Sequence, residues 1–138
     1  MSRNLQSRSM FIADDNEALL SAVKRQFENR FQQVCVFNSG ENLLDALAHE
    51  NPDIILLDLK MSGMSGIETL RKIRATHWQP LVIILTAYIS SAEHTVAKAL
   101  GAFDIVVKRV GLDDLDLAVT RALKYLDTDS ESHHERAG

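Results

Sequence analysis

The stretch Asp53-Ile54-Ile55-Leu56-Leu57-Asp58 places four consecutive apolar residues between two aspartates. A strand with one solvent-exposed face would alternate apolar and polar side chains, and this stretch does not. A short continuous apolar run is typical of a strand that is covered on both faces, as in a parallel sheet. The stretch therefore predicts a buried parallel strand that is followed at once by Asp58.

Similar apolar runs occur before and after this stretch, and apolar residues recur at helical spacing between them. The expected strands span residues 10–13, 54–57, 82–85 and 105–107, with a weaker run at 34–37 as an edge strand. The expected helices span residues 16–30, 40–49, 66–76, 90–101 and 112–126. Alternating strands and helices predict an α/β fold, namely an open, doubly wound sheet of five parallel strands with helices on both faces.

A chain of 138 residues, of which 46% are hydrophobic and 25% charged, is expected to form one globular domain. Its single cysteine, Cys35, excludes a secreted disulfide framework. No apolar run approaches the roughly 20 residues of a membrane helix, and the N-terminal residues lack the apolar segment of a signal peptide. We therefore expect a cytoplasmic protein with no membrane partner. The net charge of −4 is too small to indicate direct nucleic-acid binding.

Most of this net charge lies at the C-terminus. Residues 127–138 (DTDSESHHERAG) hold four acids and one arginine, and so account for −3 of the net −4. Because this segment has almost nothing apolar to bury, it is expected to be a disordered tail or a linker stub. The predicted organisation is an N-terminal arm over residues 1–8, a domain over 9–126 and an acidic tail over 127–138.

Carboxylate, hydroxyl and ammonium groups stand where four of the predicted strands end, namely at Asp14 and Asp15, Asp58, Thr86 and Lys108. In open α/β sheets, ligands bind at the carboxyl ends of the strands, so these side chains are expected to meet at one rim. Each has an ordinary interpretation when taken alone, as a helix N-cap or a solvated surface residue. Three carboxylates that share a site, however, stay ionised only with a compensating cation.

Oxygen ligands of this kind favour Mg²⁺. A carboxylate beside Mg²⁺ can accept a phosphoryl group, and the transferring group then needs a cation and neutral donors around it. Asp58 has an acidic pair, a hydroxyl and an ammonium at the neighbouring strand ends. The rim therefore predicts a magnesium-dependent phosphoacceptor site.

Five segments carry a resemblance to a known family: FIADDN (11–16), NSGENLL (38–44), DIILLDLKM (53–61), VIILTA (82–87) and DIVVK (104–108). They are similar to the receiver domain of two-component response regulators, the family of the chemotaxis regulators. The resemblance extends over residues 8–126 and implies a flavodoxin-like strand order of 2-1-3-4-5.

The resemblance also implies a role for each residue of the metal site. Asp58 matches the phosphoacceptor, and Asp15 matches the acid that binds Mg²⁺ directly. Asp14 matches the acid that holds the metal through water, and the backbone carbonyl of Lys60 would be a further ligand. In this family, Lys108 would pair with the phosphoryl group and the Thr86 hydroxyl would turn to bond it.

The implied partners are those of a signalling protein. A histidine kinase or a histidine phosphotransfer protein would donate the phosphoryl group. A downstream effector or a fused output domain would receive the signal, and the face formed by the fourth helix, fifth strand and fifth helix would allow a homodimer.

Three positions depart from the family pattern. Ile105 stands where an aromatic residue usually moves together with the threonine, so the switch is expected to rely on Thr86 and the 86–94 segment. Arg109 and Ser62 each replace a frequent proline. Ser62 is expected to loosen the loop before the third helix with little effect on the chemistry.

The family also implies that the residues two after the acceptor and two after the threonine tune dephosphorylation. These are Lys60 and Tyr88. The Tyr88 ring either screens the phosphoryl group from water or packs, half-exposed, on the following helix.

The sequence thus predicts a phosphorylation-dependent signalling switch and not a turnover enzyme. The alternative is a degenerate receiver that binds partners without being phosphorylated, which the substitutions at Ile105 and Arg109 leave open. A phosphatase with an aspartyl intermediate would need a second acid where Lys60 stands. A flavin-binding protein of the same topology is disfavoured because the Asp14-Asp15 pair would repel the flavin phosphate.

Overall fold

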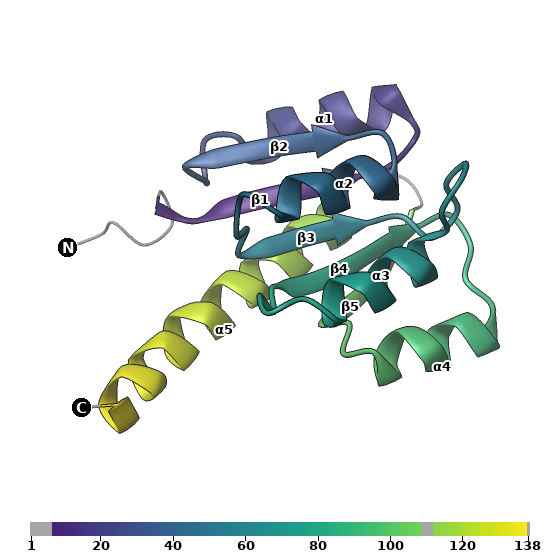
Figure 1. Cartoon of the computed structure of the whole chain (residues 1–138). Helices are drawn as coiled ribbons and strands as arrows, with labels where there is room; N and C mark the ends of the chain where they lie inside the picture. Colours follow the sequence, from purple (N-terminus) through teal and green to yellow (C-terminus); the bar gives the residue numbers. More distant parts are fainter. Residues whose placement is uncertain (1–6, 109–111, 138) are drawn as a thin grey trace.

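The structure is a computed structural model that describes residues 7–108 and 112–137, with side chains up to Thr128. Strands and helices alternate along the chain (Figure 1). The strands are β1 (Ser9–Ala13), β2 (Gln33–Phe37), β3 (Ile54–Leu57), β4 (Leu81–Thr86) and β5 (Asp104–Val107). The helices are α1 (Glu17–Phe27), α2 (Gly40–Leu47), α3 (Gly66–Arg74), α4 (Ser91–Ala99) and α5 (Asp113–Ala137).

The five strands form one parallel sheet in the order β2-β1-β3-β4-β5. This confirms the predicted fold class, the strand order and the position of 34–37 at a sheet edge. The central strand is the apolar run of residues 54–57, all four of whose side chains are fully buried. A strand with two covered faces needs no polar alternation, which is why this run is continuous.

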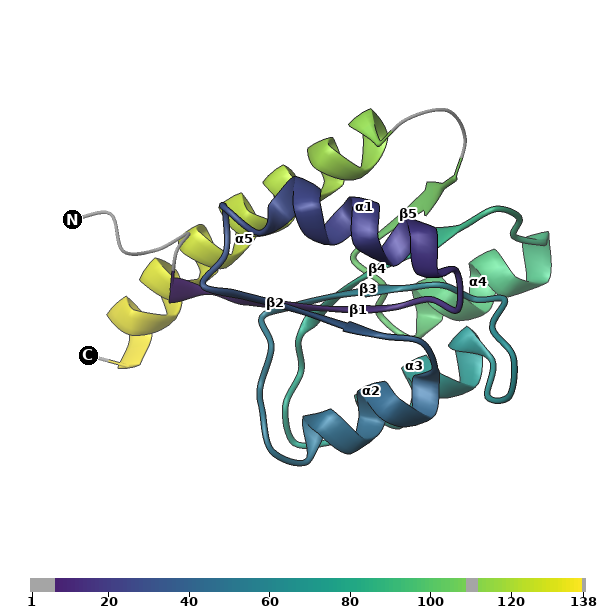
Figure 2. The same cartoon turned by 90° about the horizontal axis from the view of Figure 1, so that it is seen from above.

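Two apolar cores lie on opposite faces of the sheet. Figure 2 shows α1 and α5 on one face and α2, α3 and α4 on the other. Successive residues of β3 divide between them, because side chains alternate along a strand: Ile54 and Leu56 join the α1/α5 core, and Ile55 and Leu57 join the other. The packed layers leave the carboxyl edge of the sheet as the place where loop side chains gather.

Local signals account for the helix starts. The expected N-cap Ser39 accepts a hydrogen bond from the third residue of its helix, and Ser90 forms the predicted capping box with Glu93. The chain leaves α4 at Gly101, whose φ of 83° favours glycine. Asn16, rather than Asp14 or Asp15, caps α1. Both acids of the pair are therefore available to the rim.

The last helix differs from its prediction. It was expected to end at residue 126, but α5 continues to Ala137, because the sequence has no glycine or proline between Asp113 and Ala137 that would stop it. The Arg8 guanidinium lies 2.9 Å from the Asp127 carboxylate and so holds α5 beside the start of β1. The division into arm, domain and tail stays a prediction.

Among the described helices, none combines the length and apolar character of a membrane span.

Candidate metal centre

Backbone hydrogen bonds place the rim residues by extending the sheet one residue past the strands. The Asp14 N–H donates to the last carbonyl of β2 (3.1 Å), and the Asp58 N–H donates to the last carbonyl of β1 (3.0 Å). The Lys108 N–H donates to the carbonyl of Thr86, the last residue of β4 (2.7 Å). The sheet ladder therefore fixes where each of these side chains starts.

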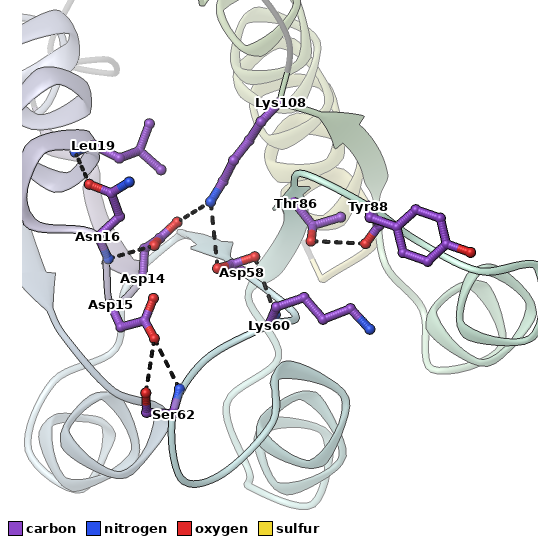
Figure 3. Close-up of polar contacts among 10 residues, drawn as sticks. All are labelled: Asp14, Asp15, Asn16, Leu19, Asp58, Lys60, Ser62, Thr86, Tyr88 and Lys108. Carbon is purple, nitrogen blue, oxygen red and sulfur yellow. Dashed lines mark hydrogen bonds and ion pairs between the residues drawn. The ribbon is translucent and has the colours of Figure 1, made fainter.

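Three carboxylates converge at this edge. Asp14, Asp15 and Asp58 each offer an oxygen, and the three oxygens lie within 4.8 Å of one another. Asp14 and Asp58 are buried, at 2% and 4% exposure, whereas Asp15 is exposed. Lys108 reaches over them, with its Nζ 2.7 Å from Asp14 Oδ2 and 3.5 Å from Asp58 Oδ2 (Figure 3). One ammonium thus pairs with two of the three carboxylates.

The electrostatics of this cluster favour an additional cation. Burial raises the pKa of Asp58, and the neighbouring Asp14 charge raises it further, while Lys108, the Lys60 N–H and the Thr86 hydroxyl oppose the shift. A divalent ion would relieve both the burial cost and the repulsion. Carboxylate oxygens are the hard ligands that Mg²⁺ takes, so the donor set fits this metal.

Thr86 is fully buried, and its hydroxyl lies close enough to Asp58 to oppose the rise in the pKa of that carboxyl. Thr86 Oγ1 donates to the backbone carbonyl of Tyr88 at 3.2 Å. The Tyr88 ring is 65% exposed and points away from the Asp58 carboxylate (Figure 3). In this arrangement the ring does not cover the acceptor, and its role in dephosphorylation stays a prediction.

Lys60 connects the acceptor to α4. Its N–H donates to Asp58 Oδ1 at 3.3 Å, while its Nζ lies 2.7 Å from Glu93 Oε2 and 5.9 Å from the centre of the Tyr88 ring. Glu93 also accepts from the Ser90 N–H and so closes the capping box of α4. The hydrogen bond from Lys60 holds the pKa of Glu93 below its usual range. One lysine therefore contacts both the acceptor and the start of α4.

Of the two substituted positions near the end of β5, the structure describes Ile105 but not Arg109. Ile105 is half-buried and packs against the core on the α2–α4 face, so an aliphatic side chain fills the place of the family's aromatic ring. Arg109 lies outside the described residues.

Gly66 is a site residue that the sequence analysis did not identify. It is the first residue of α3, directly after the N-cap Ser65. A Cβ at Gly66 would lie 2.2 Å from the carbonyl oxygen of Asp58 and 2.5 Å from Leu59 Cα. Only glycine lets α3 begin against the backbone of the acceptor. A glycine immediately after a helix cap was the available signal.

The chain is similar to proteins of one signalling family. The model of the response regulator receiver domain matches residues 10–120. The regulatory protein AtoC of Escherichia coli is 32% identical over 125 residues, covering 91% of this chain and 27% of AtoC. The transcriptional regulatory protein AfsQ1 of Streptomyces coelicolor is 35% identical, covering 84% of this chain and 51% of AfsQ1. The chain therefore spans only part of the length of these relatives.

Solved structures show the same fold. The receiver domain of a putative LuxO repressor protein from Vibrio parahaemolyticus superposes with a TM-score of 0.83 at 24% identity, covering 91% of this chain and 97% of the other. The response regulator TrrA of Thermotoga maritima, solved in complex with Mg²⁺ and BeF, gives a TM-score of 0.74 at 27% identity, with coverages of 83% and 98%.

Proposed function

Because the chain belongs to the receiver domain family of two-component response regulators, we propose that it is a phosphorylation-dependent switch whose acceptor is Asp58. Receiver domains are signalling domains rather than turnover enzymes. The observation that carries the proposal is the buried Asp58 carboxylate, which lies among two further carboxylates and the Lys108 ammonium at the carboxyl edge of the sheet.

Asp14, Asp15, Asp58 and the backbone carbonyl of Lys60 are the proposed metal ligands, with Asp14 acting through water. Bound Mg²⁺ would neutralise the carboxylates and the incoming phosphoryl oxygens. Support comes from the convergence of the three carboxylates and from the raised pKa of Asp58. The similar receiver TrrA, described with Mg²⁺ and BeF, supports the same metal.

The proposed reaction transfers a phosphoryl group from a phosphohistidine to Asp58. A carboxylate oxygen of Asp58 attacks phosphorus, a P–O bond forms, and the P–N bond of the donor breaks. The imidazole nitrogen keeps the electron pair of that bond and takes up a proton from water. The Lys108 ammonium, already 3.5 Å from Asp58 Oδ2, is placed to balance charge on the phosphoryl oxygens.

The switch would start at Thr86. Its hydroxyl exchanges the Tyr88 carbonyl for a phosphoryl oxygen, which releases the segment between β4 and α4. Ile105 has no ring or hydroxyl to follow this movement, so the response is carried by residues 86–94. The face formed by α4, β5 and α5 then reports the state of Asp58.

The proposed partners follow from this role. A histidine kinase or histidine phosphotransfer protein donates the phosphoryl group in the cytoplasm. A downstream effector or a fused output domain reads the α4–β5–α5 face, which also allows a homodimer. We expect no membrane partner, and the small net charge of −4 leads us to expect no direct nucleic-acid binding by this domain.

The test is phosphorylation by a small donor. The full chain is incubated with Mg²⁺ and acetyl phosphate, and its intact mass is measured. We expect one phosphoryl adduct that is absent without Mg²⁺ and absent in Asp58→Asn. Asp45→Asn, which alters an exposed carboxylate on α2, is the matched control and keeps the adduct. A wild-type chain that binds no Mg²⁺ and forms no adduct would overturn the proposal in favour of a phosphorylation-independent interaction module.

A further inference from the structure

Ser62 makes two hydrogen bonds to the exposed acid of the cluster. Its backbone N–H and its Oγ both donate to Asp15 Oδ2, at 3.0 Å and 3.3 Å. A proline, which is frequent at this position in the family, has neither an N–H nor a hydroxyl. The substitution therefore does more than loosen the loop, because it adds two donors that face a proposed metal ligand.

These bonds leave the other oxygen of Asp15 facing the cluster. Figure 3 shows Oδ2 turned to Ser62 and the second carboxylate oxygen pointing toward Asp14. An exposed aspartate otherwise samples several side-chain rotamers. With one oxygen held by the loop, the second is kept where the three carboxylates converge.

The loop that carries Ser62 is itself anchored on both sides. Before it, the Lys60 N–H is bonded to Asp58. After it, Gly63 makes a turn with φ of 77°, and the Met64 N–H donates to Glu41 Oε2 at 3.2 Å. Because the loop is fixed independently of Asp15, Ser62 can orient the carboxylate rather than follow it.

We propose that Ser62 is a positioning residue that pre-orients Asp15 as a metal ligand; the inference rests on the proposed function of the acidic cluster. Ser62 donates to the oxygen that faces away from the cluster, so its bonds persist when the other oxygen binds an ion. The expected consequence is tighter Mg²⁺ binding, because less side-chain freedom is lost when the ion binds.

The test measures Mg²⁺ binding without any phosphodonor. Mg²⁺ is titrated into the isotope-labelled full chain, and Kd is read from amide chemical shifts. We expect Ser62→Ala, which keeps the N–H, to weaken binding about twofold, and Ser62→Pro to weaken it about five- to tenfold. Ser21→Ala is the matched control, because Ser21 is exposed on α1 and lies outside the 86–94 segment.

A double variant separates positioning from general loop damage. Once Asp15→Ala has removed the carboxylate, adding Ser62→Ala should leave the weakened Kd unchanged. This comparison keeps the test decisive even where Ser62→Pro fails to fold, which its unfolding curve would show. Equal or tighter Mg²⁺ binding by Ser62→Ala, against a wild type that binds Mg²⁺, overturns the positioning role and leaves the proposed function standing. A wild type that binds no Mg²⁺ overturns both.

Discussion

Replacing Asp58 by asparagine should stabilise the protein when Mg²⁺ is absent. The substitution keeps the shape of the side chain and an oxygen that accepts from the Lys60 N–H, which lies 3.3 Å from Asp58 Oδ1. It removes the negative charge from a nearly buried site. The loss of this charge relieves the burial and the repulsion by Asp14 that raise the pKa of Asp58.

The distances set the size of the effect. Carboxylate oxygens within 4.8 Å repel by about 1 kcal/mol in water and about 3.5 kcal/mol at an effective dielectric constant of about 20. The Lys108 ammonium at 3.5 Å attracts by about 1 to 5 kcal/mol under the same conditions. Asp58 faces two carboxylates and shares its single ammonium with Asp14, so repulsion and burial together exceed the attraction. We expect a gain of about 1–2 kcal/mol in the free energy of unfolding.

The assay is urea unfolding of wild type and Asp58→Asn over a range of pH, with a chelator present. Because the folded-state pKa of Asp58 is raised, the folded protein binds this proton more tightly than the unfolded chain. The advantage of the variant is therefore complete above the folded-state pKa. It shrinks as the pH falls through that value and disappears below the unfolded-state pKa.

Asp45→Asn on the exposed surface of α2 is the control and should change stability little at any pH. At saturating Mg²⁺, wild type should be more stable than Asp58→Asn. Wild type binds the ion with Asp58 as a third carboxylate, and this additional binding energy stabilises its folded state. If the variant were equally stable or less stable than wild type at neutral pH without Mg²⁺, burial of Asp58 and its repulsion by Asp14 would not destabilise the folded protein, and the reasoning would be refuted.

Three further outcomes follow from the site. Gly66→Ala should destabilise the fold by about 3 kcal/mol in urea unfolding, because the new Cβ meets the rigid carbonyl of Asp58 at 2.2 Å; an unchanged midpoint would contradict this packing. Tyr88→Ala should alter the decay of the phosphorylated protein less than about twofold, since the ring points into solvent; markedly faster decay would restore the screening role. Ile105→Tyr should change the affinity for a kinase or effector, measured by titration, more than the rate of phosphorylation; a pure rate effect would argue against a switch carried by residues 86–94.

The sequence is informative where a structural cause is local. The run at 54–57 specified a strand covered on both faces because every one of its residues is apolar. The Ser90 capping box depends on a residue only three positions away. The rim was predictable for a different reason: parallel strands bring their carboxyl ends to one edge, so Asp58 and Lys108 had to lie near each other once the strands were identified.

Contacts between loops were not predictable in this way. Lys60 and Glu93 are 33 residues apart, and Ser62 and Asp15 are 47 apart. Strand order places the loops side by side, but the direction of each side chain depends on turns such as the one at Gly63. The length of α5 escaped prediction because a polar segment without glycine or proline is compatible with either a helix or a disordered tail.

The loop after β3 connects the acceptor to both of its neighbours. On one side, Ser62 donates to Asp15 and thereby touches the proposed metal ligands. On the other side, Lys60 binds Asp58 through its N–H and Glu93 through its ammonium. The exposed Lys60–Glu93 pair contributes little stability, so it can break without unfolding the domain. Because Glu93 also caps α4, a change of charge at Asp58 that draws the Lys60 ammonium away would loosen the start of α4. Such a movement would connect the acceptor to α4 without an aromatic side chain at Ile105.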